Sequence, residues 1–188
     1  MKFTEAEEQL VFAEDFLERV RNSESHQEFK KWWQAYRTCI ATAINSLKNQ
    51  LLKGGFLKGN HFHQMIKRAE GQPELQYVLQ ARHSSFHSID PVSEVIDGYI
   101  YFYIPEPPEV EVRENGAIIA PAHSLKNIGI VSPRIKLIPV SNRGRIYLVP
   151  MCKTDSGDVT EHDPMTLGSV AISQVRKTIQ EFEKTTTV

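Results

Sequence analysis

Apolar residues recur at steps of three and four along both ends of the chain, but this spacing stops in the middle. The clearest stripe covers 29–51, where the apolar positions are Phe29, Trp32, Trp33, Tyr36, Ile40, Ala43, Ile44, Leu47 and Leu51. Such spacing places the side chains on one face of an α-helix. That face needs other helices against it, so the sequence predicts a helical bundle. We expect both tryptophans to lie in its core.

Three further stripes predict three more long helices, and local residues mark where several of the helices begin or end. Ser25 with Glu28 is typical of a capping box, and Gly54-Gly55 is a strong helix stop. Pro73 and Pro164 suit the first helical position, where a missing N–H costs nothing. We predict helices over about 4–22, 25–53, 73–88 and 164–184. Residues 54–72 fit either a loop or a loop followed by a short helix over 61–70.

The period changes after Gly98. Residues 99–104 are aromatic and β-branched, which indicates a strand. An Asn-Gly pair predicts a hairpin over 110–119, and a second hairpin is expected between 134–140 and 145–149. Asp90-Pro91 followed by Glu94 indicates a capped turn of helix. The predicted fold is mainly α, of the α+β class. It is a four-helix bundle in a single domain, 1–188, with an antiparallel β-hairpin insertion at about 98–151, between the third and last long helices.

Composition narrows the protein classes further. No window is apolar over the roughly 18 residues that a membrane span needs, and the acidic start of the chain has no secretory h-region. Cys39 and Cys152 are far apart and form no zinc spacing or disulfide framework. These features indicate a reducing, cytoplasmic setting and no membrane partner.

Charge is distributed unevenly along the chain. Residues 1–28 carry a net charge of −5, residues 29–82 carry +7, and residues 83–188 carry −3. A basic middle is typical of a face that binds anions such as RNA, although a solvated helix face neutralised by the acidic first helix has the same composition. The candidate RNA-binding residues are Lys30, Lys31, Arg37, Lys67 and Arg68. Arg134, Lys136, Arg143 and Arg145, with Tyr147 for base stacking, would extend that surface, or form a plain polar hairpin tip.

The segment Arg82-His83-Ser84-Ser85-Phe86-His87 resembles the signature of the HEPN superfamily (higher eukaryotes and prokaryotes nucleotide-binding). That signature is an arginine, a polar residue, three further positions and a histidine. The resemblance implies a metal-independent endoribonuclease that leaves 2′,3′-cyclic phosphate and 5′-hydroxyl ends. Its catalytic residues would be Arg82, His87 and His83, and it would need no cofactor. The resemblance also implies a homodimer, and a toxin or defence role with an antitoxin or nucleotidyltransferase as a partner.

The chemistry of these side chains fits that reaction. Arginine presents a permanent charge to phosphate oxygens, and histidine exchanges protons near neutral pH. On a continuous helix, however, Arg82 and His87 point about 140° apart. Either the helix is irregular at Ser84-Ser85, or a second subunit completes the site.

Two other functions fit the same residues. The bundle could be a non-catalytic module that binds a nucleotide, RNA or a protein. Alternatively, His61 and His63 with His83 and His87 could hold zinc in a metal-dependent hydrolase, although no cysteine or carboxylate stands close in sequence to complete the set. In the simplest interpretation, Arg82 makes a salt bridge at the helix end and His87 caps it.

Overall fold

The computed structural model describes residues 2–55, 60–87, 91–103, 111–112, 118–119, 126–131, 134–153, 159–160 and 163–186. The chain forms two compact units. The first contains Met1–Glu94 and Lys136–Val188, and the second contains Val95–Ile135. The expectation of one domain over 1–188 stays a prediction. No helix in the described part of the chain is both long enough and apolar enough to cross a membrane.

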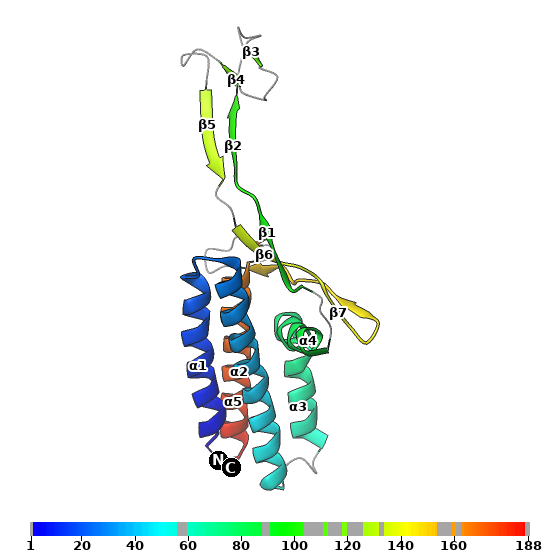
Figure 1. Ribbon diagram of the computed structural model, residues 1–188. Coiled ribbons are helices and arrows are strands. Elements are labelled where there is room, and N and C mark those ends of the chain that lie inside the picture. Colours follow the sequence, from blue (N-terminus) through cyan, green and yellow to red (C-terminus); the bar gives the residue numbers. More distant parts are fainter. Residues whose placement is uncertain are drawn as a thin grey trace. The chain divides into compact units, whose positions relative to one another are not determined.

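The first unit is helical. In Figure 1, α1, α2 and α5 run alongside one another and α3 lies to one side, whereas α4 is seen nearly end-on and crosses them. Four of the five helices match the predicted long helices. The fifth, α3, is the short helix that was one of the two alternatives for 54–72. Their bounds are α1 Thr4–Arg21, α2 His26–Lys53, α3 Asn60–Glu70, α4 Pro73–His87 and α5 Pro164–Thr186.

Local chemistry sets the helix ends, as predicted. The Ser25 hydroxyl accepts a hydrogen bond from the Glu28 N–H at 3.1 Å. The Glu28 carboxylate reaches back to accept from the N–H of Glu24, just before the N-cap, also at 3.1 Å. α2 ends before Gly54, and Gly55 adopts a φ of 75°, which favours glycine. At α5, the Asp163 carboxylate accepts from the Thr166 N–H at 2.8 Å.

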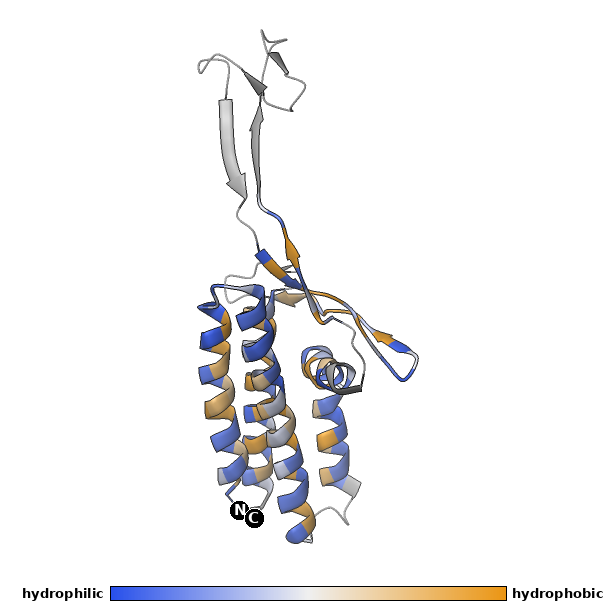
Figure 2. Cartoon of the chain, viewed as in Figure 1, coloured by the Kyte–Doolittle hydropathy of each residue, from blue (hydrophilic) through white to orange (hydrophobic). Residues whose placement is uncertain are grey.

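The predicted apolar stripes form the core. Figure 2 shows hydrophobic residues along the faces that the helices turn towards one another. Trp33 is fully buried and stacks on Tyr36, with 4.8 Å between ring centroids. The Tyr36 hydroxyl donates to the Gly168 carbonyl at 2.9 Å, which ties α2 to α5. Trp32 is only half-buried, against Phe16 of α1, so the core prediction holds fully for Trp33 alone.

Two strand assignments near the helices correct the sequence prediction. β1 (Ser93–Ile96) is a strand, where a capped turn of helix was expected, and it pairs with β6 (Arg134–Leu137). The expected hairpin therefore uses only part of 134–149: β7 (Val140–Asn142) pairs antiparallel with β8 (Arg145–Tyr147). Pro139 lies between β6 and β7, and a proline has no N–H for a strand ladder, so the two strands pair separately.

The turn of the β7–β8 hairpin has two residues with positive φ. Arg143 has a φ of 51° and Gly144 a φ of 74°. This combination matches a type I′ turn, whose twist suits a two-residue hairpin. Glycine adopts such a φ without strain, whereas for arginine it is unfavourable.

The second unit consists of strand pairs. β2 (Tyr99–Tyr103) pairs antiparallel with β5 (Lys126–Val131), with a register shift between Tyr101 and Tyr103. β3 (Glu111–Val112) pairs antiparallel with β4 (Ile118–Ile119), as the predicted hairpin requires. The Asn-Gly turn lies outside the described residues. In the first unit, β9 (Cys152–Lys153) pairs antiparallel with β10 (Val159–Thr160). The chain is therefore mainly helical with small antiparallel strand pairs, an α+β arrangement.

Candidate functional site

The helix α4 carries the Arg82–His87 segment without interruption. It is α-helical from Pro73 to His87, so the backbone shows no break at Ser84-Ser85. Arg82 is half-buried and His83 is exposed. The side chain of His87 lies outside the described residues. A continuous helix leaves positions 82 and 87 pointing about 140° apart, so the first of the two predicted solutions, an irregular helix at Ser84-Ser85, is not seen.

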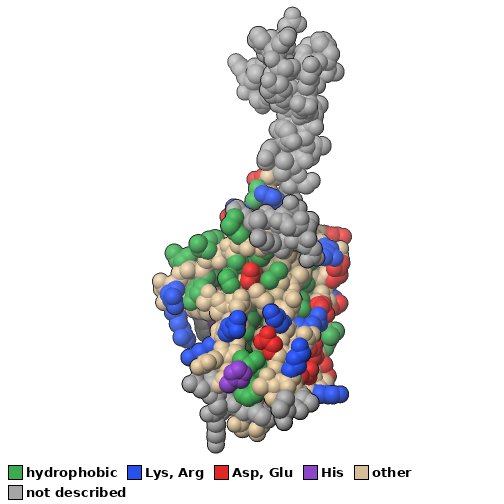
Figure 3. All heavy atoms as spheres, turned by 180° about the vertical axis from the view of Figure 1, so that it is seen from behind, with side chains coloured by type: hydrophobic (Ala, Val, Ile, Leu, Met, Phe, Trp, Pro, Cys, Tyr) green, Lys and Arg blue, Asp and Glu red, His purple; other side chains and the backbone are tan. Residues whose placement is uncertain are grey.

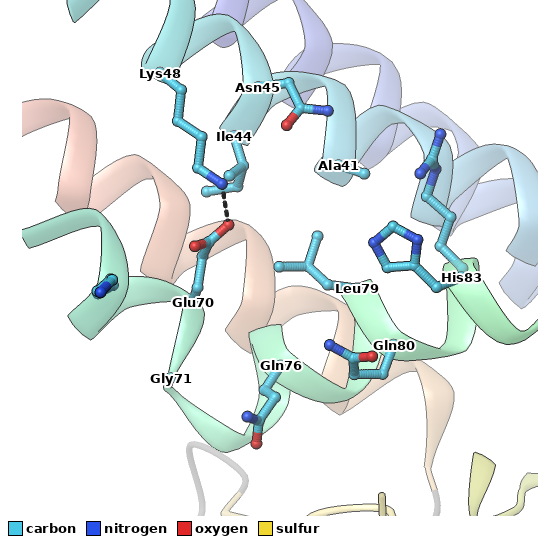
Figure 4. A pocket seen from close by; sticks show the side chains of 12 residues that line it. Ala41, Ile44, Asn45, Lys48, Glu70, Gly71, Gln76, Leu79, Gln80 and His83 are labelled. Carbon is cyan, nitrogen blue, oxygen red and sulfur yellow. Dashed lines mark hydrogen bonds and ion pairs between the residues drawn. The ribbon is translucent and has the colours of Figure 1, made fainter. Parts of the chain in front are cut away.

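A first hollow of about 380 Å³ lies between α2, α3 and α4. Figure 4 shows Lys48 and Glu70 on one side of it and His83 on the other, with Gln80 between α4 and the open space. Lys48 Nζ lies 2.5 Å from Glu70 Oε1, and Glu70 is the one carboxylate among the described residues of the lining. The polar and charged residues of the lining are Asn45, Lys48, Lys67, Glu70, Gln76, Gln80, Arg82 and His83.

A second hollow of about 340 Å³ lies between α4 and the β7–β8 hairpin, on the other side of Gln80 and His83. Asn142 Nδ2 donates to Gln80 Oε1 at 2.6 Å, which joins the hairpin to the helix. Among the residues that the structure describes, no carboxylate lines this hollow. Its lining is Gln80, His83, Asn142, Arg143, Arg145 and Tyr147. Because Gln80 and His83 belong to both linings, the two hollows adjoin along α4.

Arg37 holds α4 from beneath, although the sequence predicted it to bind RNA. It is 2% exposed, its Nη1 donates to the Ala81 carbonyl, and its Nε donates to the Trp33 carbonyl at 3.3 Å. Burial lowers the pKa of Arg37 to about 10, the nearby Tyr77 opposes this, and the charge of Arg82 adds to it. Arg37 therefore cannot meet RNA on the surface, and the prediction for this residue does not fit the structure.

Tyr77 fixes the other side of α4. Its hydroxyl donates to the Ile138 carbonyl at 2.7 Å, just before β7. Burial raises the pKa of this hydroxyl far above its usual value, so it stays a neutral donor. Arg37 and Tyr77 together connect α2, α4 and the chain entering β7. The residues around the two hollows are thus held on both sides of α4.

The other predicted RNA-binding residues are spread over the first unit. Lys67 lines the first hollow, whereas Arg68, one residue later, lines a separate hollow between α3 and α5. Lys30 and Lys31 are exposed in the first turns of α2 and are not in either lining; Lys31 Nζ lies 4.3 Å from the ring centroid of Trp32. Lys136 forms an ion pair with Glu94 at 2.7 Å. The hollows add Lys48 and Gln80, which the sequence did not single out.

Acidic residues gather elsewhere. α1 carries six acidic and two basic residues. Figure 3, seen from behind Figure 1, shows acidic side chains along the right-hand edge, the side on which α1 lies. Arg176 of α5 meets some of them, with Nη1 2.9 Å from Glu14 Oε1. Among the cations that line the first hollow, Lys48 of α2 pairs with Glu70 of α3.

Among the residues whose side chains the structure describes, no three His, Cys, Asp or Glu lie close enough together to hold a metal ion.

No protein-family model, curated protein or solved structure matches this chain.

Both hollows offer Lys or Arg side chains, which suit anionic groups, and His83 belongs to both linings as a group that can exchange a proton.

Proposed function

We propose that the protein is a metal-independent endoribonuclease with a HEPN-like four-helix arrangement. The observation that carries the proposal is the position of His83, next to Arg82, in the lining shared by two hollows that are rich in Lys and Arg. Cations on both sides of a titratable group suit a strand whose phosphates run past a proton-transfer site.

In this reaction the RNA supplies its own nucleophile. One histidine takes the proton of a 2′-hydroxyl, and the 2′ oxygen then forms a bond to the adjacent phosphorus. The bond from phosphorus to the 5′ oxygen breaks, and the leaving oxygen receives a proton from a second imidazole. We assign proton transfer to His83 and His87. We assign Arg82 to the phosphate, because its guanidinium can neutralise the charge that develops on the oxygens.

A second copy of the chain is part of the proposal. α4 is continuous, so positions 82 and 87 of one helix are about 140° apart, and a two-fold axis near α4 would bring two such segments around one phosphate. We therefore expect a homodimer in which one protomer supplies residues to its partner's site.

The test is cleavage of single-stranded RNA in excess EDTA. Wild type is expected to produce 2′,3′-cyclic phosphate ends, and Arg82→Ala, His83→Ala and His87→Ala are each expected to lose on the order of 100-fold or more in rate. His63→Ala is the matched control, because His63 is an exposed histidine of α3 outside both linings. Circular dichroism checks that each variant is folded.

Activity that disappears with EDTA and returns with a divalent ion would contradict the proposal and favour the histidine-based metal hydrolase. If Arg82→Ala and His87→Ala both keep full activity, the assignment of Arg82 and His87 as catalytic residues is wrong.

A non-catalytic RNA-binding module is the second candidate. It is favoured by the lining of the second hollow, which offers guanidinium, amide and aromatic groups and a single titratable imidazole. Tight binding of RNA by wild type, with no product from any RNA, would select this function. A protein partner such as an antitoxin or nucleotidyltransferase stays a prediction from the sequence resemblance.

A further inference from the structure

We propose that the second hollow, between α4 and the β7–β8 hairpin, is a subsite that takes one unpaired base of RNA. The inference rests on the proposed function in one respect only: it assumes that the ligand is RNA. It adds that recognition requires a single strand, and it names the residues that read the base.

The aromatic side chain comes from the register of the hairpin. In a strand, residues two apart point to the same face. Arg145 and Tyr147 of β8 both line the hollow, while Ile146 between them is 72% exposed. The ring of Tyr147 is thus available for stacking in a site that also holds a guanidinium for the neighbouring phosphate. An aromatic ring beside a cation is the usual arrangement for binding single-stranded nucleic acid.

The hydrogen-bonding groups come from the contact between helix and hairpin. Asn142 Nδ2 donates to Gln80 Oε1, which fixes both amides. This bond uses one atom of each amide, so the amino group of Gln80 keeps its capacity to donate and the carbonyl oxygen of Asn142 its capacity to accept. The Watson–Crick edge of every base offers a donor next to an acceptor. In a duplex that edge is occupied, so only an unpaired base can use these groups.

The size and charge of the hollow suit one nucleotide. Its volume of about 340 Å³ is at the lower end of the range for ligand sites, which begins at roughly 300 Å³. The described lining contains two guanidinium groups, Arg143 and Arg145, and no carboxylate, so it favours a phosphate with the base. His83, shared with the first hollow, connects this base to the phosphate that would be cut.

The experiment separates base recognition from backbone binding. Wild type is titrated with a 2′-O-methyl single strand, which lacks the attacking hydroxyl, with the same strand containing abasic sugars, and with the matched duplex. We expect the single strand to bind at least about 10-fold more tightly than the abasic strand or the duplex. Tyr147→Ala should weaken binding of the single strand by about 5- to 150-fold and leave the abasic strand unchanged.

Two matched variants control for the fold. Tyr147→Phe keeps the ring and should bind like wild type. Ile146→Ala removes an exposed side chain from the other face of the same strand and should change nothing. Thermal melting of each variant identifies any loss of structure, and in that event Gln80→Ala provides the same comparison from the helix side.

The outcomes distinguish this inference from the proposed function. If Tyr147→Ala weakens binding of both strands equally, or of neither, the base subsite is wrong, even when Arg82→Ala still abolishes cleavage. If wild type binds the abasic strand as tightly as the single strand, the subsite is likewise wrong. If wild type cuts no RNA but Tyr147→Ala shows the expected selective loss, the subsite stands and the endoribonuclease proposal fails.

Discussion

The dependence of RNA binding on salt tests whether both hollows hold one strand. Among the residues that the structure describes, the two linings contain five Lys or Arg side chains and one carboxylate, Glu70, which pairs with Lys48. With His83 counted as neutral, these side chains carry a net charge of +4, and under the proposal each unit of charge meets one phosphate. Each phosphate that a protein neutralises on a single strand releases about 0.7 of a counterion. The logarithm of the binding constant should therefore fall with the logarithm of salt concentration with a slope of about −2.8.

Single substitutions should change that slope by a fixed step. For wild type, raising the salt from 50 to 200 mM should weaken binding by about 50-fold. Arg145→Gln or Lys67→Gln removes one phosphate contact, so the slope should become about −2.1 and the same change of salt should weaken binding by about 20-fold. The matched control is Arg21→Gln, which removes the same charge from α1, where Arg21 pairs with Glu18 at 2.7 Å.

The assay is fluorescence anisotropy with a labelled 2′-O-methyl strand, at several salt concentrations and one pH. Arg21→Gln should keep the wild-type slope, because net charge alone does not release counterions from a bound phosphate. The reasoning is refuted if Arg145→Gln and Lys67→Gln keep the wild-type slope. It is also refuted if Arg21→Gln changes the slope as much as they do.

Four further predictions concern stability and assembly. Ser25→Ala should lower the free energy of unfolding by about 1 kcal/mol in urea titrations, because the Glu28 N–H loses its acceptor; an unchanged midpoint would contradict this. Arg37→Ala should lower the free energy of unfolding by roughly 3 kcal/mol, since two hydrogen bonds from a charged donor are lost and relief of desolvation offsets only part; a stability equal to wild type would refute the positioning role. Burial and the charge of Lys30 lower the pKa of His26 in the folded protein. As the pH falls below about 6.5, the unfolded chain therefore binds a proton at His26 more readily than the folded chain does, and the free energy of unfolding decreases. His26→Gln should therefore show a smaller loss of stability than wild type between pH 7 and 5, and parallel curves would contradict it. Light scattering should give twice the mass of the chain at micromolar concentration. A mass equal to that of one chain would refute the proposal that two protomers share the site.

The helices could be predicted because their signals are local. The stripe over 29–51 and the cap at Ser25 depend on residues within a few positions of one another. β1 was mispredicted for the same reason: Pro91 and Glu94 fit a helical turn, but pairing with β6, about forty residues away, decides the conformation. Only the folded chain brings these segments together.

Arg37 shows a signal that the charge count overlooked. It was grouped with the basic residues of 29–82 as an RNA contact. Yet Trp33, Arg37 and Ile40 follow the same three- and four-residue steps as the apolar stripe. The spacing therefore places Arg37 on the buried face of α2, where its stem packs and its guanidinium finds backbone carbonyls. A cation on an apolar stripe is better predicted as structural than as a surface contact.

The candidate site itself needs contacts that no local pattern encodes. Lys48 of α2, Lys67 of α3 and Arg145 of β8 all line hollows beside His83. The sequence suggested the chemistry of positions 82–87, and it suggested a basic surface over the helices and the hairpin. It did not indicate that Gln80 separates two hollows, because that depends on how α4 crosses the bundle and where the hairpin attaches.

At the hairpin tip, Arg143 has a left-handed backbone conformation, and the residue that would be most stable there is not the residue that would bind best. An arginine with a φ of 51° is strained by about 1 kcal/mol or more relative to glycine, which would relax the turn at once. The same exchange would withdraw a guanidinium from the second hollow. A selection for thermal resistance alone would therefore favour substitutions at this position that erode recognition. Variants recovered from such a selection would be sturdier proteins and poorer binders, and position 143 is where the two properties would first separate.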